Sequence, residues 1–146
     1  MAIRLDSIAP SLAASYWGAP TSRRERATRL ACELAVRGTG LAGPEVTAAL
    51  EALRTSTPDR PSLRSDMERL AARLDDEYFR LDNPGREDMR QAALQTFSKA
   101  RAASALTFAL SSDDSQLHEA IYEAVIAMDD PSTVIQSLET ALGPGD

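Results

Sequence analysis

The residues best suited to chemistry lie between positions 118 and 123. His118 is the only histidine in the chain, and a histidine is the side chain that ordinarily titrates near neutral pH. Glu119 and Glu123 are four residues apart, so a helix projects both carboxylates from one side, where they could hold a hard cation together with carboxylates of a second helix. Dinuclear carboxylate sites in helical bundles use a Glu-x-x-His pair on each of two helices, and this sequence has no such pair. We therefore interpret Glu119 and Glu123 as a solvated acidic face and predict no metal site.

Three short acidic clusters are the other candidates for metal chemistry. They are Asp75-Asp76-Glu77, Asp113-Asp114 and Asp129-Asp130. Two of them precede expected helices, where a carboxylate caps free N–H groups and meets the positive end of the helix dipole. If the fold gathered all three, they could bind magnesium in a small helical enzyme that cleaves nucleotides. Capping is the simpler interpretation, and we predict no catalytic residue and no cofactor.

Cys32 is the only cysteine, so the chain cannot form an internal disulfide or a zinc site of Cys and His ligands. It lies beside the apolar face of an expected helix, which predicts a buried, unreactive thiol. The sequence contains no Gly-x-Ser-x-Gly motif and no glycine-rich phosphate loop after a strand. With one histidine, a Ser-His or Cys-His dyad would have to use His118.

The elements that must position these residues are helices. Glycine and proline fall mostly between segments in which apolar residues recur at helical spacing, and no stretch shows the alternation of a strand. The expected helices cover about 22–37, 44–56, 62–82, 86–110 and 114–128, with a last one around Val134–Leu142 and a short one before Pro20. The predicted fold class is all-α: a single-domain bundle of about six or seven short-to-medium helices, mostly antiparallel neighbours.

The length of 146 residues fits one domain with its own core, which we place at 1–142, followed by a frayed tail at 143–146. No stretch approaches the roughly 20 apolar residues of a membrane span. Asp6 and Pro10 interrupt the apolar run that a secretion signal needs. The sequence therefore predicts a cytoplasmic protein.

Residues 106–131 have the sequence LTFALSSDDSQLHEAIYEAVIAMDDP, in which a helix end, an acidic turn and an alanine-containing helix precede a proline. The segment resembles the second half of a tetratricopeptide repeat, which implies an antiparallel pair of helices here. It covers under a fifth of the chain, and no Trp-Leu-Gly-Tyr set stands upstream at the repeat spacing.

The charge is unevenly distributed along the chain. Sixteen basic and 22 acidic residues give a net charge of −6, which argues against binding to nucleic acid or to an anionic membrane. After Arg101 there is no basic residue, and the last 45 residues carry a charge of −8. An acidic surface of this kind favours a protein partner with an electropositive surface.

A helical wheel of residues 114–128 places Ile126 nearly opposite the core positions around Ala124 and Met128, with Tyr122 beside it. We therefore predict an interface on this helix and the loop after it, formed by Tyr122, Ile126, Glu119, Glu123, Asp129 and Asp130. The alternative is a central helix that buries both faces, with the N-terminal segment on the second one. On the helix at 62–82, the wheel turns Phe79 away from the leucine seam, and we expect it to pack under the turn at 82–86.

Together these features predict a non-enzymatic acidic helical protein that binds another protein. An inhibitor of the immunity or antitoxin kind is the most concrete version, by analogy of size and charge. The alternatives are a small metal-dependent enzyme that uses carboxylates, and a structural or regulatory module that self-associates as a homo-oligomer.

Overall fold

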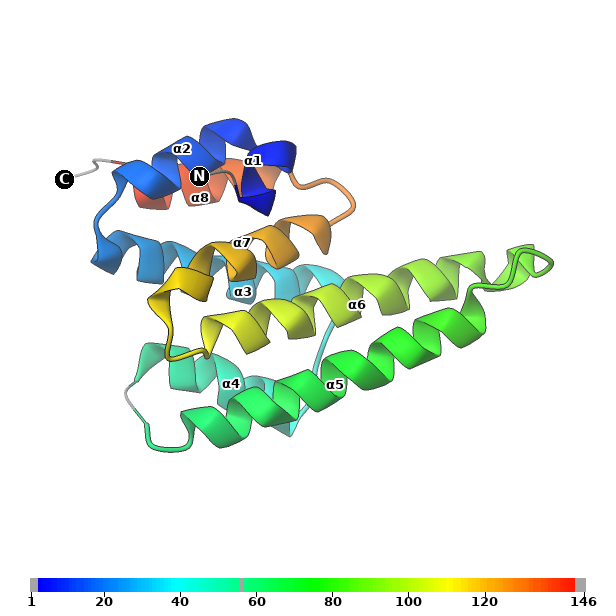
Figure 1. Cartoon of the computed structure of the whole chain (residues 1–146). Coiled ribbons are helices and arrows are strands. Elements are labelled where there is room, and N and C mark those ends of the chain that lie inside the picture. The colour runs from blue at the N-terminus through cyan, green and yellow to red at the C-terminus, as the bar shows by residue number, and fades with distance from the viewer. Residues whose placement is uncertain (1–2, 56, 144–146) are drawn as a thin grey trace.

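A computed structural model describes residues 3–55 and 57–143 (Figure 1). It is 81% helical, and the described residues form eight α-helices and no strand. The elements are α1 (Arg4–Ile8), α2 (Pro10–Gly18), α3 (Thr21–Thr39), α4 (Pro44–Arg54), α5 (Arg60–Leu81), α6 (Arg90–Ala109), α7 (Leu117–Ile126) and α8 (Ser132–Leu142), with 3₁₀ turns η1 (Glu87–Met89) and η2 (Asp114–Gln116) before α6 and α7.

The all-α prediction is confirmed, and the predicted count of six or seven helices is too low. The N-terminal segment forms two helices where one was expected. Pro10 has no N–H to continue a helix, so α1 ends at Ile8 and a new helix begins at Pro10. No helix of the described residues is long and apolar enough to cross a membrane.

The core lies around the second half of α6, which packs against α3, α5 and α7 (Figure 1). This half is rich in alanine, and Ala100, Ala102, Ala103 and Ala105 are fully buried. Small side chains let neighbouring helices approach closely, while larger residues such as Leu106 and Ile121 fill the remaining space. α1, α2 and α8 form a further layer beyond α3 and α7.

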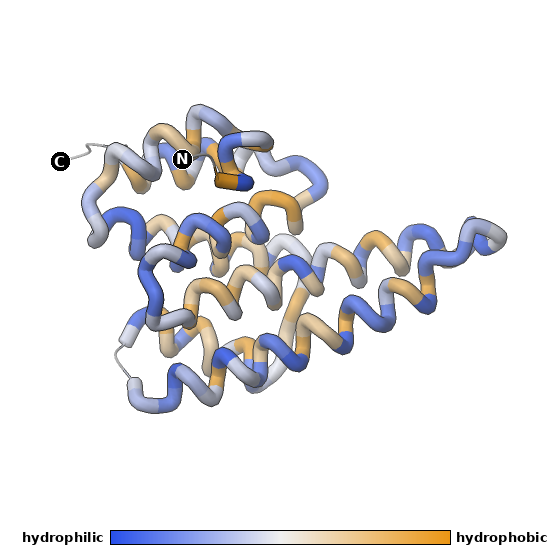
Figure 2. The backbone as a smooth tube through the Cα atoms, viewed as in Figure 1, coloured by the Kyte–Doolittle hydropathy of each residue, from blue (hydrophilic) through white to orange (hydrophobic). Residues whose placement is uncertain are grey.

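The two longest helices, α5 and α6, form an antiparallel hairpin that extends past the rest of the molecule (Figure 1). The leucine seam of α5 faces α6, and Met67 within it is fully buried. Apolar residues continue along the projecting part of the hairpin, interspersed with polar ones (Figure 2). The hairpin therefore has a proximal half inside the body and a distal half outside it.

The helix pair implied by the repeat-like segment is present as the end of α6 and α7, joined by η2. Most of the predicted tail lies outside the described residues. Its first residue, Gly143, is held in place, because its N–H donates to the Glu139 carbonyl and its own carbonyl accepts a hydrogen bond from Arg23.

Candidate functional site

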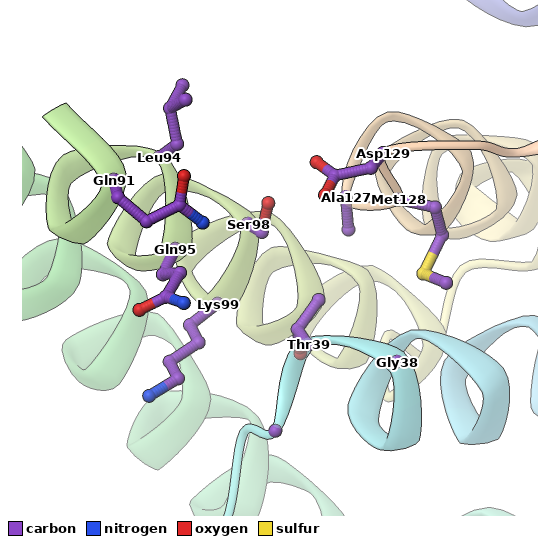
Figure 3. A pocket seen from close by; sticks show the side chains of 11 residues that line it. Gly38, Thr39, Gln91, Leu94, Gln95, Ser98, Lys99, Ala127, Met128 and Asp129 are labelled. Carbon is purple, nitrogen blue, oxygen red and sulfur yellow. The ribbon is translucent and has the colours of Figure 1, made fainter.

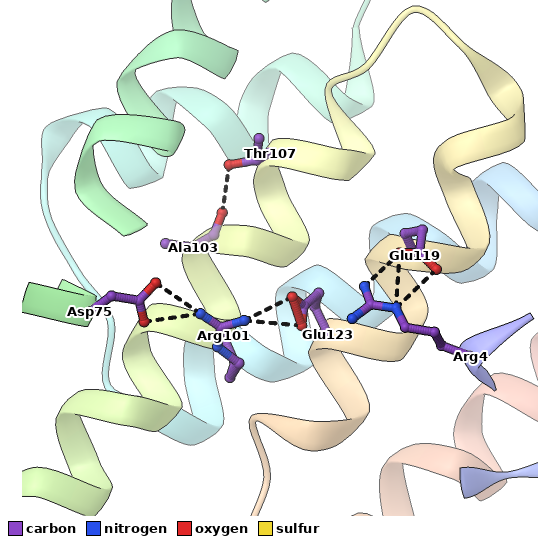
Figure 4. Close-up of polar contacts among 7 residues, drawn as sticks. All are labelled: Arg4, Asp75, Arg101, Ala103, Thr107, Glu119 and Glu123. Atoms are coloured by element: carbon purple, nitrogen blue, oxygen red, sulfur yellow. Dashed lines mark hydrogen bonds and ion pairs between the residues drawn. The ribbon is translucent and has the colours of Figure 1, made fainter. Parts of the chain in front are cut away.

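The acidic face predicted on α7 is largely covered. The side chain of Glu123 is only 5% exposed, and its Oε1 accepts a hydrogen bond of 2.9 Å from Nη1 of Arg101 on α6 (Figure 4). Nη2 of the same arginine lies 3.0 and 3.1 Å from the two carboxylate oxygens of Asp75 on α5. Burial raises the pKa of Glu123, and the Arg101 guanidinium opposes that rise. The expectation of a solvated Glu123 is wrong, because the α5/α6 hairpin packs over this residue.

Glu119 is also paired. Its carboxylate accepts hydrogen bonds from Arg4 of α1, with Nε 3.1 Å from Oε2 (Figure 4). The Arg4 guanidinium lies 4.2 Å from the centre of the Tyr122 ring, so one residue of the N-terminal helix covers both positions. Tyr122 and Ile126 are partly buried. The N-terminal segment thus lies on this side of α7, as the alternative interpretation of the wheel supposed.

His118 packs in an aromatic cluster. Its ring lies 6.2 Å from that of Tyr16 and 6.1 Å from that of Trp17, while Arg24 stacks over both of these rings. The thiol of Cys32 is fully buried, and burial raises its pKa to about 12. The predicted burial of Cys32 is confirmed. A thiol held in its neutral form is a poor nucleophile.

The acidic clusters are used differently from one another. Asp113 and Asp130 each accept hydrogen bonds from the N–H and the hydroxyl of the serine two residues later, which lowers the pKa of both carboxyls. Asp113 is thus the N-cap of η2, as the cap interpretation predicts, whereas Asp130 precedes the N-cap Pro131 of α8 and closes a turn. Within 3–55 and 57–143, no three His, Cys, Asp or Glu side chains form a group that could hold a metal ion.

A more accessible surface opens where α6 leaves the body of the molecule. Ser98, Ala102 and Ala105 follow Leu94 at helical spacing, so all four lie on one face of α6. The two alanines are fully buried under the body, whereas Leu94 is 48% exposed. The distal half of the hairpin therefore leaves uncovered the continuation of a face that is core elsewhere.

This uncovered face ends at a cavity of about 340 Å³, which we call the step cavity (Figure 3). Its walls come from three parts of the chain: the C-terminal end of α3, the outer face of α6 and the segment that follows α7. The lining residues are Gly38, Thr39, Gly40, Gln91, Leu94, Gln95, Ser98, Lys99, Ala127, Met128 and Asp129. Of the predicted interface residues, Asp129 alone lines this cavity.

A second cavity, of about 230 Å³, lies between α5 and α6 at the tip of the hairpin. Leu94 lines it too, together with Tyr78, Leu81 and Ala93. Leu94 therefore lies between the two cavities, and a partner that covered Leu94 would contact both of them. Leu94 was not predicted from the sequence, although the expected helices at 62–82 and 86–110, both longer than their neighbours in the chain, were a signal that the hairpin would project.

Phe79 is the most exposed large apolar residue that the structure describes, with 73% of its surface accessible. Tyr78 fills the space between the helices, with its ring 5.4 Å from that of Phe97 and 5.6 Å from that of Phe79. The next residue along a helix points about 100° away, so Phe79 lies outside the seam. The expectation that it packs under the following turn is therefore wrong.

No protein-family model, no curated protein and no solved structure matches the chain. Function must therefore be inferred from the geometry of the molecule itself.

Proposed function

We propose that this protein binds another protein through the distal half of the α5/α6 hairpin, with Leu94 at the centre of the contact. The observation that carries the proposal is the position of Leu94, half exposed between two cavities on a helix face whose continuation at Ala102 and Ala105 is fully buried. Exposed apolar side chains beside hollows are typical of binding surfaces in which a few anchors supply most of the affinity.

The charge around this surface favours an electropositive partner. Residues 76–95 contain five acidic and three basic side chains, and Asp129 lies at the step cavity. By contrast, Glu119 and Glu123 are neutralised within the fold by Arg4 and Arg101. The hairpin and Asp129 thus present exposed acidic charge beside Leu94, and this charge would speed the approach of a basic protein.

The function that fits these features is that of a non-enzymatic inhibitor, of the kind in which a small acidic immunity protein or antitoxin blocks a basic toxin. A rigid hairpin that projects from a compact body can enter the cleft of such a partner with little loss of conformational freedom on binding. The class of partner is proposed from charge and shape.

The test is site-specific photocrosslinking in the organism that makes the protein. A photoreactive phenylalanine analogue replaces Leu94 in one variant and Thr133, an exposed residue of α8, in another. We expect a discrete adduct with a second protein from position 94 and no such adduct from position 133. Since Leu94 itself cannot be substituted when it carries the photoreactive group, a third variant carries that group at position 79. Adding Leu94→Arg to this variant should abolish its adduct. The yield of each adduct should also fall as the salt concentration rises.

The matched control is Ile8→Arg, which places the same charge on another exposed apolar residue, 39% accessible and on α1. It should leave capture unchanged. An adduct with a second copy of this chain would instead establish self-association. Equal yields from positions 94 and 133, or equal losses with Leu94→Arg and Ile8→Arg, would overturn the proposal.

A further inference from the structure

The step cavity lies where the C-terminal ends of two helices meet. The C-terminal end of α3 and the end of α7 both border it. The last carbonyl groups of a helix lack partners within the helix and carry the negative end of its dipole. α3 has Arg37 in its last turn to offset this charge, whereas α7 has no basic residue in its last turn.

Asp129 adds a full negative charge at the end of α7. Its carboxylate is exposed and makes no hydrogen bond or ion pair with any residue that the structure describes, in contrast to that of Asp130, which is bonded to Ser132. Figure 3 shows the Asp129 side chain pointing from α7 toward α6 across the cavity. The carboxylate is therefore available to a ligand.

The opposite wall supplies apolar contact and one positive charge. On α6, Leu94 offers apolar surface along which the hydrocarbon stem of a long side chain could lie. Lys99 is the only basic residue among the lining residues, and its side chain extends away from Asp129 (Figure 3). Within the described part of the chain it forms no ion pair, so it does not neutralise Asp129.

We propose that the step cavity receives an arginine side chain of the protein partner, with the Asp129 carboxylate as its ion-pair partner beside the negative end of the α7 dipole. A guanidinium has five N–H donors in a plane, so two of them can bond the two oxygens of one carboxylate side by side. Its stem would lie against Leu94. The inference rests on the proposed function and adds the chemistry of one contact.

A minimal probe tests this without the partner. N-acetyl-arginine amide is titrated into the ¹⁵N-labelled protein, and N-acetyl-citrulline amide, which replaces the guanidinium by an uncharged urea, serves as the control ligand. We expect saturable shifts of the amides of Leu94, Lys99, Met128 and Asp129 at millimolar concentration with arginine and not with citrulline.

Variants on the two walls should act in opposite directions. Asp129→Asn should weaken binding of the arginine probe by at least fivefold, and Lys99→Gln should tighten it severalfold, because it removes the like charge. The matched control is Asp114→Asn, which makes the same change at an exposed aspartate that does not line the step cavity. It should leave the dissociation constant unchanged.

The inference is overturned if citrulline shifts the same amides as strongly, or if Asp114→Asn weakens binding as much as Asp129→Asn. Capture of a partner at position 94 without any arginine binding would reject the inference and leave the proposed function standing. Arginine binding without capture at position 94 would reject the proposed function and leave the cavity as a guanidinium site.

Discussion

The Glu123 carboxylate on α7 and the Arg101 guanidinium on α6 meet at 2.9 Å in a place where their side chains are 5% and 18% exposed. Arg101 also holds Asp75, so a single side chain connects α5, α6 and α7. The connection lies on α6 between the uncovered face around Leu94 and the buried alanines from Ala102 onward. It therefore fixes the base of the projecting hairpin.

Replacing Arg101 by Met should destabilise the protein by about 3 kcal/mol, because removal of one partner leaves a buried carboxylate without compensation. Urea denaturation at pH 7 measures this. Asp75→Asn is the control, since this carboxylate is 38% exposed and water can replace part of the contact. We expect it to cost less than about 1 kcal/mol. Equal losses for the two variants would contradict the account of Arg101.

The raised pKa of Glu123 predicts a specific dependence of stability on pH. Burial raises this pKa above its ordinary value of 4.5, so the folded protein holds the Glu123 proton more tightly than the unfolded chain does. The resulting stabilisation is complete below about pH 4.5 and is lost as the pH rises through the folded-state pKa.

Glu123→Gln removes this titration and should gain stability relative to the natural protein as the pH rises from 4 to 7. The comparison is the difference in the free energy of unfolding between the two proteins at each pH. Exposed carboxyls with lowered pKa, such as those of Asp113 and Asp130, titrate in both proteins and cancel in the difference. A difference that stays constant with pH would refute the prediction.

Truncation of the two exposed apolar residues of the hairpin should barely affect folding. Phe79→Ala should change the free energy of unfolding by under about 0.5 kcal/mol, since most of this side chain is in water. Leu94→Ala should cost under about 1 kcal/mol, because only about half of the Leu94 side chain is removed from water. Leu106→Ala in the core of the same hairpin should cost about 2 to 5 kcal/mol. If thermal or urea unfolding shows comparable losses at positions 94 and 106, Leu94 is not a free surface.

Ile126→Ala separates the two interpretations of α7. The residue is partly buried, so its truncation should cost about 1 to 2 kcal/mol, between the values for exposed and for fully buried residues. A loss below about 0.5 kcal/mol in urea denaturation would indicate that this face of α7 is exposed to solvent. The predicted interface at Tyr122 and Ile126 would then be favoured again.

Gly38→Ala should close the step cavity. A Cβ at this position would lie 2.3 Å from Cε and 2.8 Å from Sδ of Met128, so the flexible methionine must move, and it already lines the cavity. Replacement of a helical glycine by alanine gains about 1 kcal/mol of helix propensity, which offsets the displacement. We expect nearly unchanged stability and severalfold weaker binding of the arginine probe. Met128→Ala in the same chain should restore binding.

Helical periodicity was enough to predict the all-α class and the approximate position of every helix from α3 onward. The leucine seam of α5 also predicted its packing against a neighbour. The division of the N-terminal segment into α1 and α2 depends on Pro10, which is visible in the sequence and was not used to place a boundary. Helix propensity and the spacing of apolar residues thus predicted most of the fold.

The candidate site was less predictable, because a wheel describes one helix and not what packs against it. Glu119 and Glu123 look solvated on the wheel of α7, yet Arg4 is 115 residues from Glu119 in the chain and only the fold brings them together. Likewise, Leu94 belongs to the same stripe as Ala102 and Ala105, and its exposure results from the place where the body stops covering α6. Tertiary contacts decided both outcomes.

The alanines of α6 also bear on how this protein can evolve. Ala100, Ala102, Ala103 and Ala105 have no accessible surface, so a larger residue at any of them would force neighbouring helices apart. Gln91, Leu94 and Gln95, on the same helix, are free to change without disturbing that packing. One continuous helix therefore joins a segment where almost no substitution is tolerated to a segment where many are. Substitutions in the distal segment can change binding preferences while the packing of the helices stays the same.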